Sequence, residues 1–373
     1  MKKILICALL AQGVYASSDF DEFRSGFDQY AQQMSEGFEE YKRVYLKEFE
    51  EFKKELAKYW PTQDITTNDT WVEYSKDLRD RKVVDYEHGQ INLEVIAEDE
   101  DEARKRILDL IDQLAHDTTV SAYNNDQIEQ NVQKQVDQPK KEIVEIPMVS
   151  DVMDPQELQR QREKVEKEDL KVTEYEGNTI YTVDIKMPPD HVLKKAQSFW
   201  PMVKQYGEQK RVDADLIYAI MHSESSFNPM ARSHIPAFGL MQIVPSSAGR
   251  DVNNLLHNHT RAPSSDFLYD PNNSILFGAS YLHILNYRYL SAIEDPLSRL
   301  YCVIAAYNTG AGNVARAFIG SNNVSRAAQK INAMSPQQVF DHLVQNLPYE
   351  ETRNYLVKVQ ERLPIYERFV SQQ

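Results

Sequence analysis

Apolar side chains recur every three or four positions among charged residues from Phe20 to Trp60. This spacing matches the 3.6-residue turn of an α-helix and predicts one aromatic stripe along it. The stripe comprises Phe20, Phe23, Phe27, Tyr30, Met34, Phe38, Tyr41, Tyr45, Phe49, Phe52, Leu56 and Tyr59. Pro61 follows, so we expect a long amphipathic helix over residues 17–61. Its stripe needs an apolar partner, either a second copy of the helix or the rest of the chain.

Residues 68–190 mix two periodicities and predict a small α+β domain. Val83 to Ala97 and Val172 to Met187 alternate like paired strands around glycine-containing turns, whereas Glu98 to His116 has apolar residues at helical spacing. The stretch from Asp117 to Gln138 is rich in Asn, Gln and Asp, and we interpret it as a polar linker or long loop.

Helical spacing prevails over residues 191–373, which predict a mainly α domain. His191 to Gly207 is expected to be one helix, and Asp213 is a residue type that caps the start of the next. The apolar face of that second helix is formed by Leu216, Ile217, Ile220 and Met221.

The charge balance limits the classes of molecule that the protein is expected to bind. The chain has 373 residues, with 42 Lys and Arg against 57 Asp and Glu, a net charge of -15. The acidic excess lies within residues 1–190, whereas residues 191–373 have a small basic excess. Nucleic acid and anionic lipid both favour cationic surfaces, so neither is expected as the main partner.

The amino terminus has the pattern of a signal peptide over residues 1–16, with a basic start, an apolar run and small residues before a cleavage site after Ala16. Cys7 follows three bulky residues, Ile4 to Ile6, which argues against a lipid-attachment site. Only Cys302 remains in the mature chain, so no internal disulfide is expected.

One carboxylate occupies an unusual position. Glu224 lies four residues after Ile220 and eight after Leu216, so it projects from the apolar face of its predicted helix. Removal from water disfavours the charged form of a carboxyl group and raises its pKa. Such a group can hold a proton near neutral pH and donate it to a substrate.

Four motifs follow in order. They are Glu224-Ser225-Ser226-Phe227-Asn228-Pro229 with Ser233 nine positions after Glu224, Gly239-Leu240-Met241-Gln242, Ala306-Tyr307-Asn308-Thr309-Gly310-Ala311-Gly312, and Glu351-Thr352-Arg353-Asn354-Tyr355. This set resembles the catalytic domain of soluble-lytic-transglycosylase-like enzymes, glycoside hydrolase family 23, which cleave bacterial murein. Within that family, Ser264 to Tyr281 and Asp295 to Phe318 are similar to the membrane-bound lytic murein transglycosylase C group.

The resemblance extends over roughly Trp71 to Arg362 and implies a lysozyme-like, goose-type fold for the catalytic domain. It implies that Glu224 is the catalytic acid and base. It further implies that seven residues contact the glycan or line its cleft, namely Ser225, Ser233, Met241, Gln242, Tyr307, Asn308 and Tyr355. Ser233 and Gln242 would hydrogen-bond the sugars, Met241 would wall the cleft, and Tyr355 would reach toward Glu224.

The implied reaction is non-hydrolytic cleavage of the β-1,4 bond between N-acetylmuramic acid and N-acetylglucosamine in peptidoglycan, leaving a 1,6-anhydro end. The motifs supply one acid where glycosidases usually use two. That favours attack by the sugar's own C6 hydroxyl over attack by water. Two alternatives stay open: a goose-type-lysozyme-like hydrolase, and a peptidoglycan-binding protein without activity. The signal peptide predicts a periplasmic location, and association with the outer membrane stays open as an alternative. The amphipathic helix would self-associate or bind an envelope partner.

Two other patterns carry no cofactor or metal. The glycines of Gly310-Ala311-Gly312 imitate a dinucleotide fingerprint, but they follow a helix, so we predict a turn with Asn313 as the next helix cap. His257-Asn258-His259 lies in a polar stretch without further ligands, and we expect a solvated loop.

Overall fold

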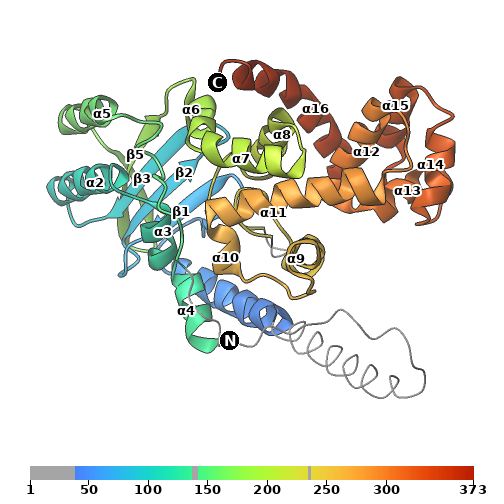
Figure 1. The fold of residues 1–373 in the computed structure, drawn as a ribbon. Helices are drawn as coiled ribbons and strands as arrows, with labels where there is room; N and C mark the ends of the chain where they lie inside the picture. The colour runs from blue at the N-terminus through green and yellow to red at the C-terminus, as the bar shows by residue number, and fades with distance from the viewer. Residues whose placement is uncertain (1–37, 137–141, 234–236) are drawn as a thin grey trace, which may run out of the picture.

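The computed structural model describes residues 38–136, 142–233 and 237–373. The predicted signal peptide and the first part of the predicted long helix lie outside the described residues. The sequence-local elements assemble into an α+β part and a larger helical part (Figure 1). One continuous core of buried side chains runs through both parts.

The α+β part contains a five-stranded antiparallel sheet in the order β1-β2-β3-β5-β4. The strands are β1 (Thr70–Tyr74), β2 (Asp80–Asp85), β3 (Gln90–Ile96), β4 (Lys171–Tyr175) and β5 (Asn178–Lys186). Both predicted hairpins are therefore confirmed, since β2 pairs with β3 and β4 pairs with β5, although β4 is exposed along most of its length. Helix α2 (Glu100–Leu114) packs on the sheet and α5 (Pro155–Lys167) packs on α2 (Figure 1).

The predicted polar linker is wrong. Residues 117–138 contain two helices, α3 (Thr119–Asn125) and α4 (Gln127–Gln135). Tyr123, Ile128 and Val132 are buried in the core, and these few apolar residues suffice to dock short helices. The polar residues that indicated a loop instead cap the helices, because the Thr118 and Asp126 side chains accept hydrogen bonds from backbone N–H groups.

A helix over residues 38–56 is the described part of the predicted amphipathic helix. Its stripe is covered by the rest of the chain, with Tyr41 and Tyr45 buried in the core. The Tyr41 hydroxyl donates to Glu129 of α4 at 2.8 Å, and the Tyr41 ring meets Phe238 edge to face. In Figure 1 this helix lies beside α4. Its partner over this range is therefore the chain itself.

The helical part is confirmed as mainly α. Its helices are α6 (His191–Ser198), α7 (Trp200–Lys210), α8 (Ala214–Ser225), α9 (Arg250–His257), α10 (Ser265–Tyr269), α11 (Pro271–Ile284), α12 (Pro296–Thr309), α13 (Ala311–Ile319), α14 (Val324–Ile331), α15 (Pro336–Asn346) and α16 (Glu350–Val370). Two π-helical turns, Pro245–Gly249 and Leu285–Tyr289, adjoin α9 and α11. Helix α16 packs along α8.

Two local predictions in this part need correction. His191 to Gly207 is not one helix, because Pro201 in the first turn of α7 lacks the N–H that would continue the ladder of α6. Asp213 occupies the cap position of α8, but its side chain makes no capping hydrogen bond. The Asp215 carboxylate instead accepts from the backbone N–H of Leu216.

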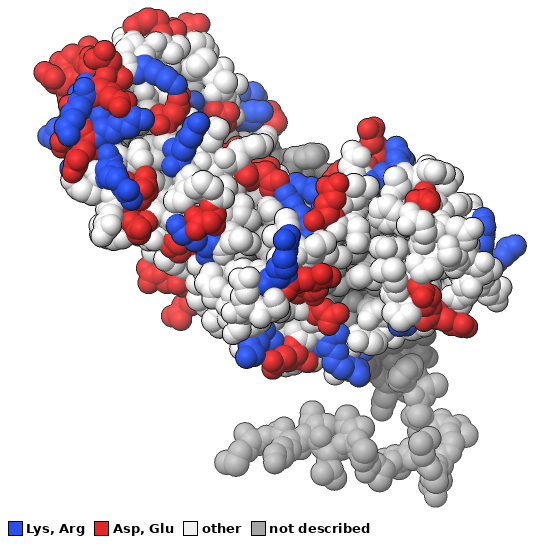
Figure 2. Space-filling view, turned by 90° about the horizontal axis from the view of Figure 1, so that it is seen from above, with Lys and Arg blue, Asp and Glu red and all other residues white. Residues whose placement is uncertain are grey.

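Charge is unevenly distributed over the surface. Figure 2 shows acidic and basic side chains crowded together at one end of the molecule, whereas the opposite end presents a larger share of uncharged surface. Residues 1–190 also contain most of the charged residues in the sequence. Within the described ranges, no helix combines the length and apolar character needed to cross a membrane.

Candidate active site

Glu224 lies one residue before the end of α8, next to a tight turn. Ser226 and Phe227 both have positive φ, 47° and 65°, a backbone region that side chains other than glycine seldom adopt. Phe227 is fully buried and stacks on the His222 ring. Tertiary packing thus holds a strained turn directly after the acid, a pattern common at functional sites.

A cleft of about 900 Å³ opens beside Glu224. Four further residues predicted from the motifs line it, which are Ser233, Gln242, Tyr307 and Asn308. They come from the loop after α8 and from the end of α12, so the fold gathers residues separated by about 80 positions. Thr352, at the start of α16, donates a hydrogen bond to the Asn308 side chain at 2.7 Å.

The amino-terminal part contributes a wall that the motifs did not predict. Tyr45 and Phe49 of helix 38–56 and residues 65–68 line the same cleft. The backbone of Arg232 donates to the Thr67 carbonyl at 3.2 Å, which ties this wall to the loop containing Ser233. The aromatic stripe identified Tyr45 and Phe49 as packing residues, but no local signal indicated the surface they would join.

Burial raises the pKa of Glu224 to about 8. The Glu351 carboxylate also raises it, whereas Tyr355 and Lys358 oppose the shift. The hydroxyl of Tyr355 is buried and lies close enough to Glu224 to lower the pKa of that carboxyl. At neutral pH the Glu224 carboxyl therefore carries a proton.

Ser225 and Met241 do not line the cleft, contrary to our expectation. Ser225 is 1% exposed, and its hydroxyl donates to the carbonyls of Met221 and Leu240 at 3.0 and 2.8 Å. Met241 is fully buried, and its carbonyl accepts from the Tyr307 hydroxyl at 2.8 Å. The polar groups of both residues are thus already paired within the protein. We therefore interpret both as packing residues that support the cleft-lining residues.

Glu351 is a second carboxylate at the cleft. It belongs to the last motif, so the motifs bring two acids to the cleft and the expectation that they supply only one is wrong. Unlike Glu224, it is exposed to solvent. The two acids thus occupy different environments, one desolvated and protonated and the other open to water.

No group of three or more His, Cys, Asp or Glu residues able to hold a metal occurs within the described ranges. The rings of His257 and His259 stack on each other at 5.6 Å. The turn at Gly310 joins two helices as predicted, but Gly310 itself occupies the cap position of α13, with φ of 85°. The Asn313 side chain instead donates back to the Thr309 carbonyl at 3.0 Å.

Residues 201–330, which include Glu224 and the cleft residues Ser233, Gln242, Tyr307 and Asn308, match the family described as "Transglycosylase SLT domain". The class predicted from the motifs is therefore confirmed for this part of the chain.

Among individual relatives, the chain is 48% identical over 189 residues to a protein named "Membrane-bound lytic murein transglycosylase C" from Salmonella arizonae. It is 44% identical over 191 residues to the protein of that name from Serratia proteamaculans. Both alignments cover 51% of this chain and 52% of the relative, so the chain spans about half the length of these curated relatives. The lytic transglycosylase Slt from Pseudomonas aeruginosa is 22% identical, with a TM-score of 0.36 over 48% of this chain and 28% of that one.

The raised pKa of Glu224 predicts the pH dependence of any reaction in which it donates a proton. The acid is protonated below about pH 8 and loses its proton above, so kcat/KM should fall as the pH rises through that value. Glu351→Gln removes a negative neighbour and should shift this limb to lower pH, whereas Tyr355→Phe should shift it upward. Rates on sacculi between pH 5 and 10 would measure all three limbs. Identical limbs in the three proteins would contradict the assignment of the limb to Glu224.

Proposed function

We propose that this protein is a murein lytic transglycosylase. Its substrate is the β-1,4 bond between N-acetylmuramic acid and N-acetylglucosamine in peptidoglycan, and its product is a 1,6-anhydro end. The observation that carries this proposal is the protonated Glu224 carboxyl on the wall of a large cleft. The names of the relatives from Salmonella and Serratia, together with the SLT domain match, favour the same activity over hydrolysis or binding alone.

The chemistry follows from the protonation state of Glu224. A protonated carboxyl donates to the glycosidic oxygen as the bond breaks, and the sugar centre acquires oxocarbenium character. Glu224, now a carboxylate, takes the proton of the substrate's C6 hydroxyl as that oxygen attacks the same centre. The attack is intramolecular, so proximity accelerates it over attack by water.

The other cleft residues would position the glycan. Ser233, Gln242 and Asn308 offer hydroxyl and amide groups to the polar edges of the sugars. Tyr307 presents an aromatic ring beside Glu224, and Tyr355 would stabilise the carboxylate form of the acid between the two steps.

The proposal extends to organisation and location. We place a signal peptide at 1–16, an amphipathic helix at 17–61, an α+β domain at 68–190 and a lysozyme-like, goose-type catalytic domain at 191–373. The site of action would be the periplasm, where peptidoglycan lies. The word membrane-bound in the relatives' names supports association with the cell envelope, and the part of helix 17–61 before Phe38 is our candidate for contacts there, because the part from Phe38 packs against the chain itself.

The product decides between transglycosylation and hydrolysis. Sacculi digested with the purified protein in ¹⁸O-water should yield 1,6-anhydro muropeptides without the heavy isotope. Mass spectrometry separates these from hydrolysis products, which are heavier by one water and have a reducing end. Glu351→Gln is the matched variant for the hydrolysis alternative, because in that reaction the exposed Glu351 carboxylate is the group that would activate a water. Reducing ends containing ¹⁸O from the first time points would make the protein a hydrolase.

A further inference from the structure

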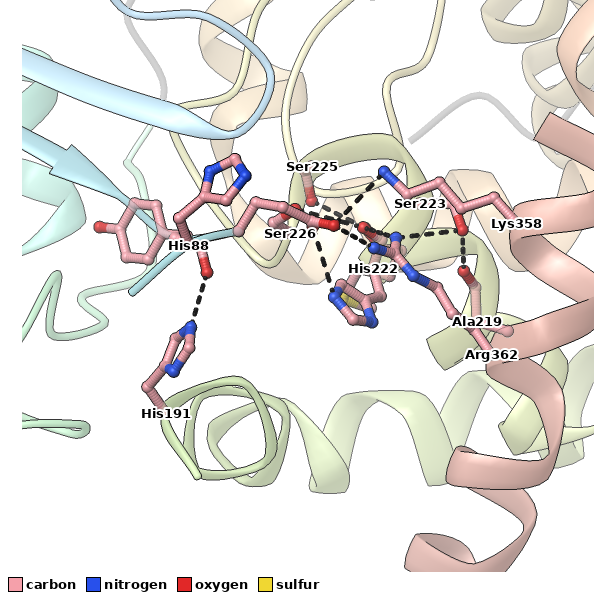
Figure 3. Close-up of polar contacts among 12 residues, drawn as sticks. His88, His191, Ala219, His222, Ser223, Ser225, Ser226, Lys358 and Arg362 are labelled. Atoms are coloured by element: carbon pink, nitrogen blue, oxygen red, sulfur yellow. Dashed lines mark hydrogen bonds and ion pairs between the residues drawn. The ribbon is translucent and has the colours of Figure 1, made fainter. Parts of the chain in front are cut away.

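The turn between β2 and β3 reaches out of the sheet to the helix that ends in the site. It comprises Tyr86, Glu87, His88 and Gly89, and Figure 3 shows it opposite α8 and α16. The Glu87 side chain contacts Ser226, at the end of α8, and Arg362 of α16. A residue of the α+β part thus lies directly behind the strained turn that follows Glu224.

Glu87 has four polar partners there, two from each helix. From α8 and its cap, the Ser226 hydroxyl donates to one carboxylate oxygen and His222 Nε2 lies 3.5 Å from the same oxygen. From α16, Arg362 pairs with the other oxygen and Lys358 Nζ lies 3.6 Å away (Figure 3). Burial alone would raise the pKa of Glu87, but these donors and cations hold it well below its usual range.

The same cluster also fixes the last turn of α8 through its backbone. Arg362 Nη1 donates to the His222 carbonyl at 2.6 Å, and the Ser226 N–H donates to that carbonyl at 3.1 Å. His222 Nδ1 is 2.9 Å from the Tyr366 hydroxyl. With Nδ1 as acceptor from Tyr366, Nε2 carries the ring proton and can donate to Glu87. His222 and Ser226, which flank the segment 223–225 containing Glu224, are therefore both held by hydrogen bonds.

The turn that presents Glu87 is itself held in place. His191 Nε2 of α6 is 3.0 Å from the Tyr86 carbonyl, and the Met187 N–H donates to the Gly89 carbonyl at 2.8 Å. Gly89 has φ of 64°, and a Cβ there would lie 2.6 Å from the His191 ring. This close approach requires glycine and leaves the turn little room to move.

We propose that Glu87 is a positioning residue for the transglycosylase reaction, holding the strained turn at Ser226 and Phe227 so that Glu224 faces the substrate. This role rests on the proposed function. It gives the α+β part a direct share in catalysis, because it supplies the carboxylate that ties α8 to α16.

The charge of Glu87 also affects the pKa of Glu224. The negative charge of Glu87 offsets part of the positive charge of Arg362 and Lys358, and Lys358 already lowers the pKa of Glu224. The charged and titratable groups that act on Glu224 are Glu351, Tyr355 and Lys358 of α16 and Tyr307 of α12. Without the charge of Glu87, the cations of α16 would favour the Glu224 carboxylate and move the basic limb of the rate profile to lower pH.

The test compares Glu87→Gln with Ser226→Ala in the full chain, using a soluble glycan strand of defined length. We expect Glu87→Gln to lower kcat by about tenfold, because small displacements of a reacting group are costly, with less than a twofold change in KM. Its basic limb should shift to lower pH. Ser226→Ala removes one contact and no charge, so its kcat should fall without a shift of the limb.

Asp184→Asn is the matched control, because Asp184 is an acid of the same sheet whose side chain contacts only Lys171 and Asn92 among the contacts described. It should behave like wild type. Unchanged kcat in both Glu87→Gln and Ser226→Ala, or a rise in KM alone, would overturn the role of Glu87. Circular dichroism checks folding, and Ser226→Ala decides if Glu87→Gln fails to fold. A wild-type protein without lytic activity would instead contradict the proposed function.

Discussion

Glu224→Gln is expected to reduce the lysis of sacculi by at least about 100-fold, the usual scale of general acid catalysis. Glutamine keeps the shape of the side chain but has no proton to transfer to the glycosidic oxygen. The protein should stay folded and still bind glycan, because the other cleft residues are unchanged. A turbidity assay on purified sacculi measures the rate, and co-sedimentation with sacculi measures binding.

Glu351→Gln is the control for this experiment, since it removes a carboxylate from the same cleft without touching the protonated acid. It should retain most of the activity at pH 6. If Glu224→Gln cleared sacculi at nearly the wild-type rate, another residue would have to be the acid.

Glu224→Gln should also change the stability of the protein in a pH-dependent manner. Folding raises the pKa of Glu224. The contribution of this carboxyl to the stability of the folded protein is therefore fully present at low pH, and it is lost as the pH rises through about 8. Glutamine cannot ionise, so Glu224→Gln should unfold at a higher temperature than wild type at pH 9. The difference should nearly vanish at pH 4.

Gly239→Ala is expected to have the largest effect on the fold near the site, lowering the free energy of unfolding by roughly 3 kcal/mol or more. Gly239 has φ of 72°, and a Cβ there would lie 2.1 Å from the Leu268 carbonyl oxygen. That oxygen belongs to the backbone of α10 and cannot rotate away. Residues 237–242, which include Gln242 of the cleft, would have to move, so activity should fall as well. Denaturant unfolding and the sacculus assay measure the two losses.

Gly320→Ala separates the two causes of this effect. Gly320 has a similar φ of 69°, but a Cβ there would meet nothing within 4 Å. It should therefore cost only the backbone strain, about 1 kcal/mol, and leave activity unchanged. Equal losses in the two variants would mean that the contact with Leu268 does not matter.

Local patterns in the sequence predicted several elements correctly. The alternation in residues 83–97 and 172–187 predicted both hairpins, because a strand buried on one face repeats every two residues. The helical spacing before Glu224 placed this acid on the apolar face of α8, and its raised pKa follows from that position. The motif order also predicted Ser233, Gln242, Tyr307 and Asn308 at one cleft.

Periodicity failed where few residues carry the packing. Helices α3 and α4 were missed because Tyr123, Ile128 and Val132 are scattered among amides, and only the docked core shows that each helix buries three residues. The motif position of Ser225 and Met241 indicated nearness to the cleft. The direction in which their side chains point depends on the neighbouring carbonyls and helices that pack against them.

The sequence by itself thus determined part of the local elements, the order of the motifs and the acid on its helix. Only the tertiary structure decided that Tyr45 and Phe49 line the cleft of Glu224, and that Glu87 pairs with Arg362, 275 positions away along the chain. The physical reason is that a local pattern shows which face of an element is apolar and must be buried. It contains no information on which distant surface will cover that face, because this depends on how all the elements pack together.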